Sequence, residues 1–296
     1  MQINFSEKDK LAELEFETLR ETVNESNITG KPFNGLMHFS FIEKIMDIAN
    51  AANLKPEINR IEAVNNNNKY APGVSQIPGL ADKHGENDHK SLLLRRVFAD
   101  ITMKSFETNE YIFSAAMIYH QGGVQIGLGP QVKACKNLCI MGAEHYVSTY
   151  GKNQVENLDH MFALIDEWFR RADTHFERGM NFLESLKNYD VNFEDFKRLV
   201  GALYMRKSLS DISRSFSSPF LKEAQIGSII DKYNSVAYNP QENKYEKPVN
   251  LYDIYANATE FHRPSYTDMP NIIEGNVELN QIFEEEVENL IIDESN

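Results

Sequence analysis

The hydrophobic pattern of this chain changes its period near residue 150, and this change restricts the fold more than any other feature. Between residues 91 and 141, apolar runs are separated by short turn-like links, ETNE (107–110) and QGG (121–123). This arrangement is typical of antiparallel strands. After residue 154, apolar residues recur at spacings of three and four, as on one face of a helix. The sequence therefore predicts an α+β fold, with an antiparallel β-sheet in the first half packed with a long helix and several shorter helices in the second half.

Further elements are predicted on either side of this change. Apolar spacing predicts a helix over 11–23, and a second helix is predicted to begin at a Ser40 cap, with Glu43 three residues later completing a capping box. A strand is expected over 57–64. The helices expected in the second half cover residues 153–190 as one long element, 192–207 capped by Asn192, 217–234 capped by Ser218 with Pro219 as the first helical residue, 251–263 and 278–291.

Composition divides the chain into four segments. We expect an acidic N-terminal helical segment (1–30), a β-rich half (31–150), a helical half (151–273) and an acidic C-terminal tail (274–296). Residues 65–90 show no periodicity and contain repeated Asn, Pro and Gly. They are expected to form a long loop, and loops of that length are usually functional or disordered.

The acidic charge is concentrated at the two ends. The chain has a net charge of −14, of which residues 1–30 carry −4 and residues 274–296, with eight acidic residues and no basic one, carry −8. Residues 195–222 instead carry six basic residues against two acidic ones. The overall charge therefore does not exclude an anionic partner, because its distribution matters more than its sum.

The chain shows no sign of a membrane protein. No run approaches the roughly 18 apolar residues that cross a bilayer, and the N-terminus lacks the basic-then-apolar order of a secretory signal. We expect a soluble cytoplasmic protein that does not contact membranes.

The basic stretch around 195–222 is the positive functional signal. Cationic side chains that contact phosphates, with aromatic side chains that stack on bases, are how single-stranded nucleic acid is held. The alternative is that the aromatic residues belong to the core and the cations lie on a solvated helix surface. The candidate nucleic-acid-binding residues are Arg95, Arg96, Lys133, Lys136, Arg198, Tyr204, Arg206, Lys207 and Arg214.

Both cysteines lie within residues 133–142. On a strand, Cys135 and Cys139 would be about 13 Å apart, which is too far for a disulfide, and only a turn at Asn137 would bring them closer. No zinc-finger spacing surrounds them. Buried thiols are the favoured interpretation.

No sequence motif nominates an enzyme. The chain lacks GxSxG, HExxH, SxxK and phosphate-loop patterns, and nothing indicates a cofactor. A metal-dependent nuclease is kept as a third hypothesis. Its ligands would come from His84, Asp88, His89, Asp100, Cys135 and His145.

Several stretches in this order resemble a family of uncharacterised phage/plasmid-like proteins carried by bacterial mobile elements. The stretches with the most specific likeness are the C-x-N-L-C segment (135–139) and NLYDIYANATE (250–260). The others are FIEKIMDIANAANLKPEINRIEAVNNNNKYAP, LLLRRVFADITM and EAQIGSIIDKY. The resemblance implies a mobile-element context and no catalytic residue. An Asn between two cysteines suits a structural motif, with the Asn137 amide fixing the backbone where the strands end.

Three functions follow from these observations, in decreasing order of preference. The first is a non-enzymatic DNA-binding protein of a phage or other mobile element, a single-stranded DNA binding or annealing protein in replication or recombination that acts as a homo-oligomer. The second is an anti-defence inhibitor or adaptor that binds a host or phage protein through its acidic surface. The third is the metal-dependent nuclease.

Overall fold

The structure is a computed structural model that describes most of the chain. The described ranges are residues 11–20, 22–24, 38–70, 92–120, 123–133, 137–138, 146–150, 154–213, 221–261 and 272–295.

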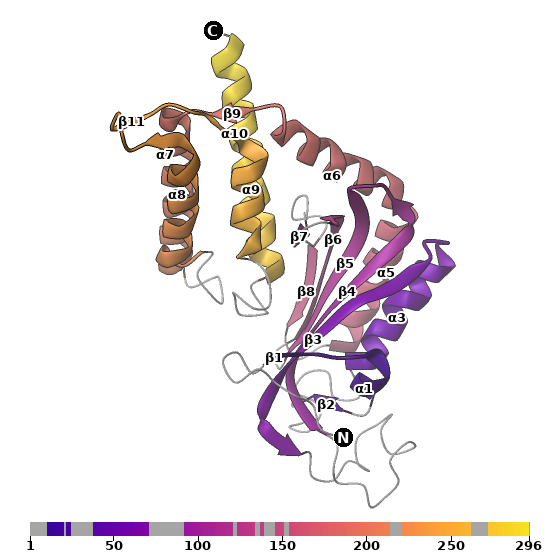
Figure 1. The fold of residues 1–296 in the computed structure, drawn as a ribbon. Helices are drawn as coiled ribbons and strands as arrows, with labels where there is room; N and C mark the ends of the chain where they lie inside the picture. Colours follow the sequence, from indigo (N-terminus) through magenta and orange to yellow (C-terminus); the bar gives the residue numbers. More distant parts are fainter. Residues whose placement is uncertain are drawn as a thin grey trace, which may run out of the picture.

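Four long strands form the centre of the first half (Figure 1). They pair with their sequence neighbours in antiparallel register: β3 (Pro56–Tyr70), β4 (Leu92–Glu107), β5 (Tyr111–His120) and β6 (Gly123–Val132). Short strands extend the sheet: β1 (Leu11–Glu13), β7 (Asn137–Leu138) and β8 (Tyr146–Tyr150) pair antiparallel, and β2 (Val23–Asn24) pairs parallel with β4. The sheet, followed by helices, confirms the predicted α+β class.

The first face of the sheet packs on helices that precede and follow it. Phe113 of β5 contacts Phe176 with ring centroids 6.1 Å apart, and Phe41 contacts Phe162 at 5.6 Å. The helices on this face are α3 (His38–Ala51), α5 (Gln154–Arg170) and α6 (Ala172–Leu186) (Figure 1). β5 is buried on both faces, so its apolar residues run almost continuously instead of alternating with polar ones.

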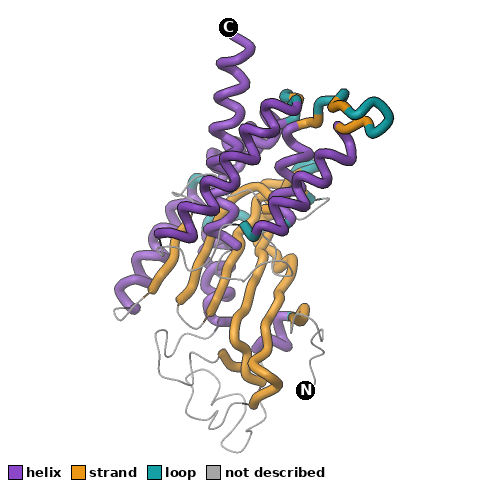
Figure 2. Tube along the Cα trace, turned by 90° about the vertical axis from the view of Figure 1, so that its left-hand side faces the viewer, coloured by secondary structure: helices purple, strands orange, loops and turns teal. Residues whose placement is uncertain are grey.

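The second face of the sheet is met by the C-terminal helix α10 (Ile272–Ser295). Ile272, Ile273 and Val277 form a small core with Phe98 and Ile118 of the sheet. Figure 2 shows the helices that follow α6 in the chain lying over the upper end of the strands, on this second face. The helix α10 therefore joins the sheet to the helical half.

The rest of the helical half comprises α7 (Phe193–Ser213), α8 (Glu223–Ala237) and α9 (Leu251–Glu260). Asn192 caps α7 as predicted, since its Oδ1 accepts the backbone N–H groups of Glu194 (2.8 Å) and Asp195 (3.1 Å). Two short antiparallel ribbons lie in the segments that connect the helices, and each consists of two-residue strands. β9 (Asp190–Val191) pairs with β12 (Val249–Asn250), and β10 (Tyr238–Asn239) pairs with β11 (Lys244–Tyr245).

The structure corrects two predictions near the N-terminus. The helix expected over 11–23 is limited to α1 (Phe16–Arg20), because residues 11–13 pair with β3 as a strand. Ser40 does not cap the next helix, which begins at His38. In both places a local pattern is compatible with helix, but the pairing or packing of neighbouring residues decides the boundary.

The long helix expected over 153–190 is two helices. It breaks at Arg171, whose φ of −113° and ψ of 23° leave the helical region, and α6 then runs across the end of the sheet (Figure 1). The apolar spacing continues through the break, so periodicity alone does not reveal it. The helix α8 begins at Glu223, not at Pro219, and Ser218 lies outside the described residues.

The segment interpreted as an acidic tail is a core helix. Besides its contacts with the sheet, α10 buries Phe283 against Tyr255 of α9, with ring centroids 5.2 Å apart. The Tyr255 hydroxyl donates to Asn280 Oδ1 at 2.7 Å, and Asn280 Nδ2 donates to Asn276 Oδ1 at 3.3 Å. These contacts fix the helix in place, because both polar and apolar side chains of α10 are buried.

Candidate functional site

The predicted basic patch on α7 faces acidic residues of α10. Arg198 Nη2 lies 2.8 Å from Glu286 Oε1, and its Nε lies 3.3 Å from Glu286 Oε2. Arg206 Nη1 lies 3.1 Å from Glu278 Oε2, and its Nη2 lies 4.0 Å from Glu285 Oε1. The two arginines are therefore neutralised along one seam between antiparallel helices.

The other predicted nucleic-acid-binding residues do not extend this patch within the described structure. Lys133 lies at the end of β6 and bonds to Glu107 Oε1 at 2.6 Å. Tyr204 is partly buried and packs against the core, in agreement with the alternative interpretation. Arg96 and Lys207 are half-buried, and each has an interaction partner. Lys136, Arg214 and the side chain of Arg95 lie outside the described part.

Asp100, one of the ligands proposed for a nuclease, lies on the second face of the sheet in a cluster of neutral donors. Its side chain is almost fully buried, and its Oδ2 accepts from Asn59 Nδ2 and Gln131 Nε2, both at 2.7 Å. The Ser114 hydroxyl donates to its Oδ1. This arrangement satisfies the carboxylate without a metal.

The remaining proposed metal ligands are His84, Asp88, His89, Cys135 and His145, and they lie outside the described residues. Among the residues that are described, no three His, Cys, Asp or Glu side chains are grouped to hold a metal ion. The nuclease hypothesis gains no support from Asp100.

The cysteine segment is described only at its centre. Asn137 pairs with Val132 as the first residue of β7, where the central strands end. Cys135 and Cys139 lie outside the described residues, so the structural motif stays a prediction.

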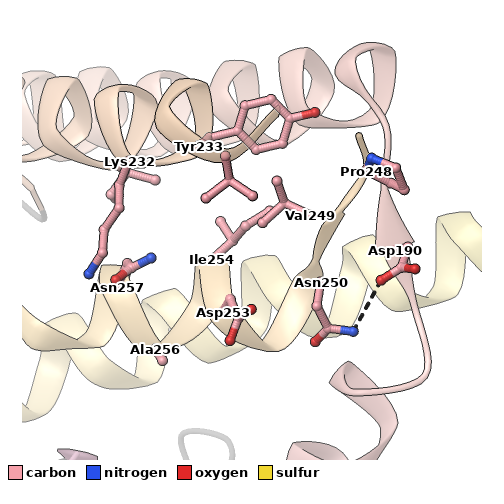
Figure 3. Close-up of a pocket in the computed structure, with 12 residues that line it drawn as sticks. Asp190, Lys232, Tyr233, Pro248, Val249, Asn250, Asp253, Ile254, Ala256 and Asn257 are labelled. Carbon is pink, nitrogen blue, oxygen red and sulfur yellow. Dashed lines mark hydrogen bonds between the residues drawn. The ribbon is translucent and has the colours of Figure 1, made fainter. Parts of the chain in front are cut away.

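An open groove lies between α8 and α9, and sequence reasoning did not identify it. It has a volume of about 540 Å³ and is closed at one end by the β9–β12 ribbon (Figure 3). Its floor is apolar and is formed by buried side chains: Ile229, Tyr233, Val249 and Ile254. Ligand sites have this combination of apolar lining and a few polar groups.

Tyr233 holds the floor of the groove in place. Its ring stacks on Phe196 with centroids 3.7 Å apart and an interplanar angle of 4°. Burial raises the pKa of Tyr233 to about 12, so the hydroxyl stays protonated at neutral pH and donates to the Val191 carbonyl at 3.4 Å. The floor is therefore preformed.

The rim of the groove is polar. Asn250 caps α9 by accepting from the Tyr252 N–H at 3.1 Å, and its Nδ2 donates to Asp190 Oδ1 at 3.3 Å. Figure 3 shows Lys232 and Asn257 at the opposite end of the groove from Asp190, with Asp253 between them. The rim thus carries a carboxylate at one end, an ammonium at the other and a second carboxylate between them.

A signal for this groove does exist in the sequence. Polar residues at positions 250, 253 and 257 recur at helical spacing beside the buried Ile254. They belong to the stretch NLYDIYANATE (250–260). The sequence alone does not show which helix would lie opposite.

No described helix has the length and apolar character needed to cross a membrane. Comparisons of the whole chain with protein-family models, with curated proteins and with solved structures yield no match in any of the three.

Proposed function

We propose that this protein acts without chemistry of its own by binding another protein, and that the partner presents basic groups. The observation that carries the proposal is the neutralisation of the predicted basic patch, in which Arg198 and Arg206 pair with carboxylates of α10. A nucleic acid would have to compete with those carboxylates for the same guanidinium groups.

The seam between α7 and α10 is costly to open. The helix α10 buries Leu279, Ile282 and Phe283, and each large buried side chain contributes about 1.5 to 3 kcal/mol. Displacing the helix to free Arg198 and Arg206 would expose these side chains. The acidic helix α10 is therefore not expected to detach so that DNA could reach Arg198 and Arg206.

The surface that remains is suited to a protein partner. Acidic residues outnumber basic ones by 44 to 30 in the chain. Among the large apolar side chains exposed on the helical half is Val236 of α8, at 54%. Carboxylates beside exposed apolar groups favour a basic and apolar protein surface and repel phosphates.

The family resemblance gives this proposal a context. In a phage or another mobile element, the partner would be a basic host or element-encoded protein in the cytoplasm, and the outcome of binding would be inhibition or recruitment. Single-stranded DNA binding by a homo-oligomer remains the competing prediction.

The two predictions are separated by fluorescence anisotropy with a labelled single-stranded oligonucleotide at low and high salt. Affinity that falls as salt rises is the signature of phosphate contacts. We expect the oligonucleotide to show no such salt-dependent binding. In parallel, the immobilised full chain is used to select from a phage-displayed random peptide library, and we expect enrichment of basic peptides.

Salt-dependent binding of the oligonucleotide that is lost in Arg206→Glu/Lys207→Glu would overturn the proposal in favour of DNA binding. A chain that enriches no peptide would also refute it. Enrichment of acidic peptides would contradict the predicted charge of the partner.

A further inference from the structure

We infer that the groove between α8 and α9 binds one amphipathic helical segment of the protein partner, with a basic side chain of that segment placed between Asp190 and Asp253. This inference rests on the proposed function and adds to it the site and the chemistry of the occupant.

The length of the groove fits a short helical segment. Lining residues run from Ile229 to Val236 on α8 and from Asn250, the cap of α9, to Asn257, which is eight residues in each case. The seven steps from the first to the last of these residues rise about 10 Å, or two helical turns. Two turns of a docked helix present two apolar side chains at i and i+4 toward such a groove.

The groove is open to solvent along its length. Val236 is more than half exposed, and the Lys232 and Asp253 side chains on the two rims are also exposed. A bound small molecule usually has about 70% or more of its surface buried in its site. An open trough between two helices, by contrast, accepts a third helix that keeps its polar face in solvent.

The wall of the groove on the α9 side is low, and this permits a docked helix to approach α9 closely. Ala256 lines the groove between Asp253 and Asn257, and its side chain is a single methyl group. Small residues allow two helices to pack closely. The only described strands at the groove, β9 and β12, are two residues long and already paired with each other, so they offer little edge for an extended peptide.

The charges along the rim select the orientation of the occupant. The Asp190 carboxylate lies at one end and the Lys232 ammonium at the other, with Asp253 between them (Figure 3). Since the N-terminus of a helix is the positive end of its dipole, a docked helix is favoured with its N-terminus near Asp190 and its C-terminus near Lys232. A Lys or Arg in its first turn would then reach the two carboxylates.

The test uses peptides enriched on the full chain, measured by anisotropy against four single variants. Val236→Glu places a charge in the groove, and Asp253→Asn removes a rim charge. Each has a matched control at an exposed residue of another surface, Met205→Glu on α7 and Asp231→Asn on α8. All four positions are exposed, so the variants should fold.

We expect Val236→Glu to weaken binding about tenfold or more, as for an interface hot spot, and Asp253→Asn to weaken it several-fold and reduce its salt dependence. Met205→Glu and Asp231→Asn should leave affinity unchanged. A peptide whose basic residue is replaced by Glu should lose binding to the native chain and regain it on Asp253→Lys.

The inference fails if the enriched peptides bind Val236→Glu as well as they bind the native chain. The proposed function of protein binding would then be kept, but the binding site would lie on another surface. It also fails if sedimentation of the chain alone shows a dimer that Val236→Glu dissociates, because a second copy would then be the occupant. Absence of any enriched peptide would refute the proposed function itself.

Discussion

His38 and Asp100, two buried ionisable groups of the sheet half, contact neutral partners, whereas Glu286 in the helical half contacts the charged Arg198. In the sheet half, His38 Nδ1 accepts the Phe39 N–H at 2.8 Å, so its proton lies on Nε2, which is 3.2 Å from the Thr22 hydroxyl. Burial lowers the pKa of His38 from 6.5 to about 3. In the helical half, burial raises the pKa of Glu286, and the hydrogen bond from Arg198 offsets part of that rise.

This difference shows two ways of placing a titratable group in a core. Neutral donors satisfy Asp100 and Thr22 satisfies His38, and the energy of each site then depends on several hydrogen bonds. At Glu286 the charge is balanced by Arg198, and a buried pair loses most when the oppositely charged partner is removed. The four predictions below test the comparison, from the largest expected effect to the smallest.

Asp100→Ala should lower the free energy of unfolding by about 3 to 5 kcal/mol, because Asn59, Ser114 and Gln131 would each lose an acceptor inside the sheet. Urea denaturation measures the change. Asp47→Ala, on the exposed side of α3, is the control and should change stability by less than about 0.5 kcal/mol. Equal effects of the two variants would show that the Asp100 cluster contributes nothing special.

Arg198→Ala should lower the free energy of unfolding by about 2 to 3 kcal/mol, because the Glu286 side chain is only 4% exposed and would lose its charged partner. Adding Glu286→Gln should recover part of the loss, which a double-mutant cycle in urea would detect. If the two effects simply add, the pair is not energetically coupled and the contrast between the halves disappears.

Acidification should destabilise the sheet half through His38. Because its folded-state pKa of about 3 lies below the ordinary value of 6.5, the unfolded state binds the proton more tightly. The stability that His38 contributes is thus present above pH 6.5 and is lost as pH falls toward 3, by up to about 1.4 kcal/mol per unit. His38→Gln should flatten this slope relative to the native chain in urea titrations between those pH values. An identical slope would mean that His38 is protonated without cost.

Glu286 should respond to pH in the opposite direction and more weakly. Its folded-state pKa lies above 4.5, so its contribution to stability is present below that value and is lost as pH rises through the folded-state pKa. Glu286→Gln should therefore remove a decline in stability with rising pH. Two-dimensional NMR of the carboxyl resonance would locate the titration, and a midpoint below 4.5 would contradict the predicted direction.

Sequence reasoning predicted the elements better than their ends. Turn-like links between apolar runs were enough to place β4, β5 and β6, and Asn192 was enough to place the start of α7. The helix at 11–23 was wrong because residues 11–13 pair with β3, which lies far away in the chain. The unbroken helix over 153–190 was wrong because the apolar spacing continues through the bend at Arg171. For the candidate site, the polar spacing of α9 was visible, but the groove needs α8 opposite it.

The sequence alone determined three features: the order of a sheet followed by helices, the excess of carboxylates, and the local cluster of cations near 195–222. Each of them follows from periodicity or charge, which are properties of neighbouring residues. Only the tertiary structure decided what those charges contact. Arg198 and Glu286 are 88 residues apart, and their pairing follows from the burial of α10 between the sheet and α9. A salt bridge of this kind depends on distances of a few ångströms between separate helices, and no local pattern specifies those distances.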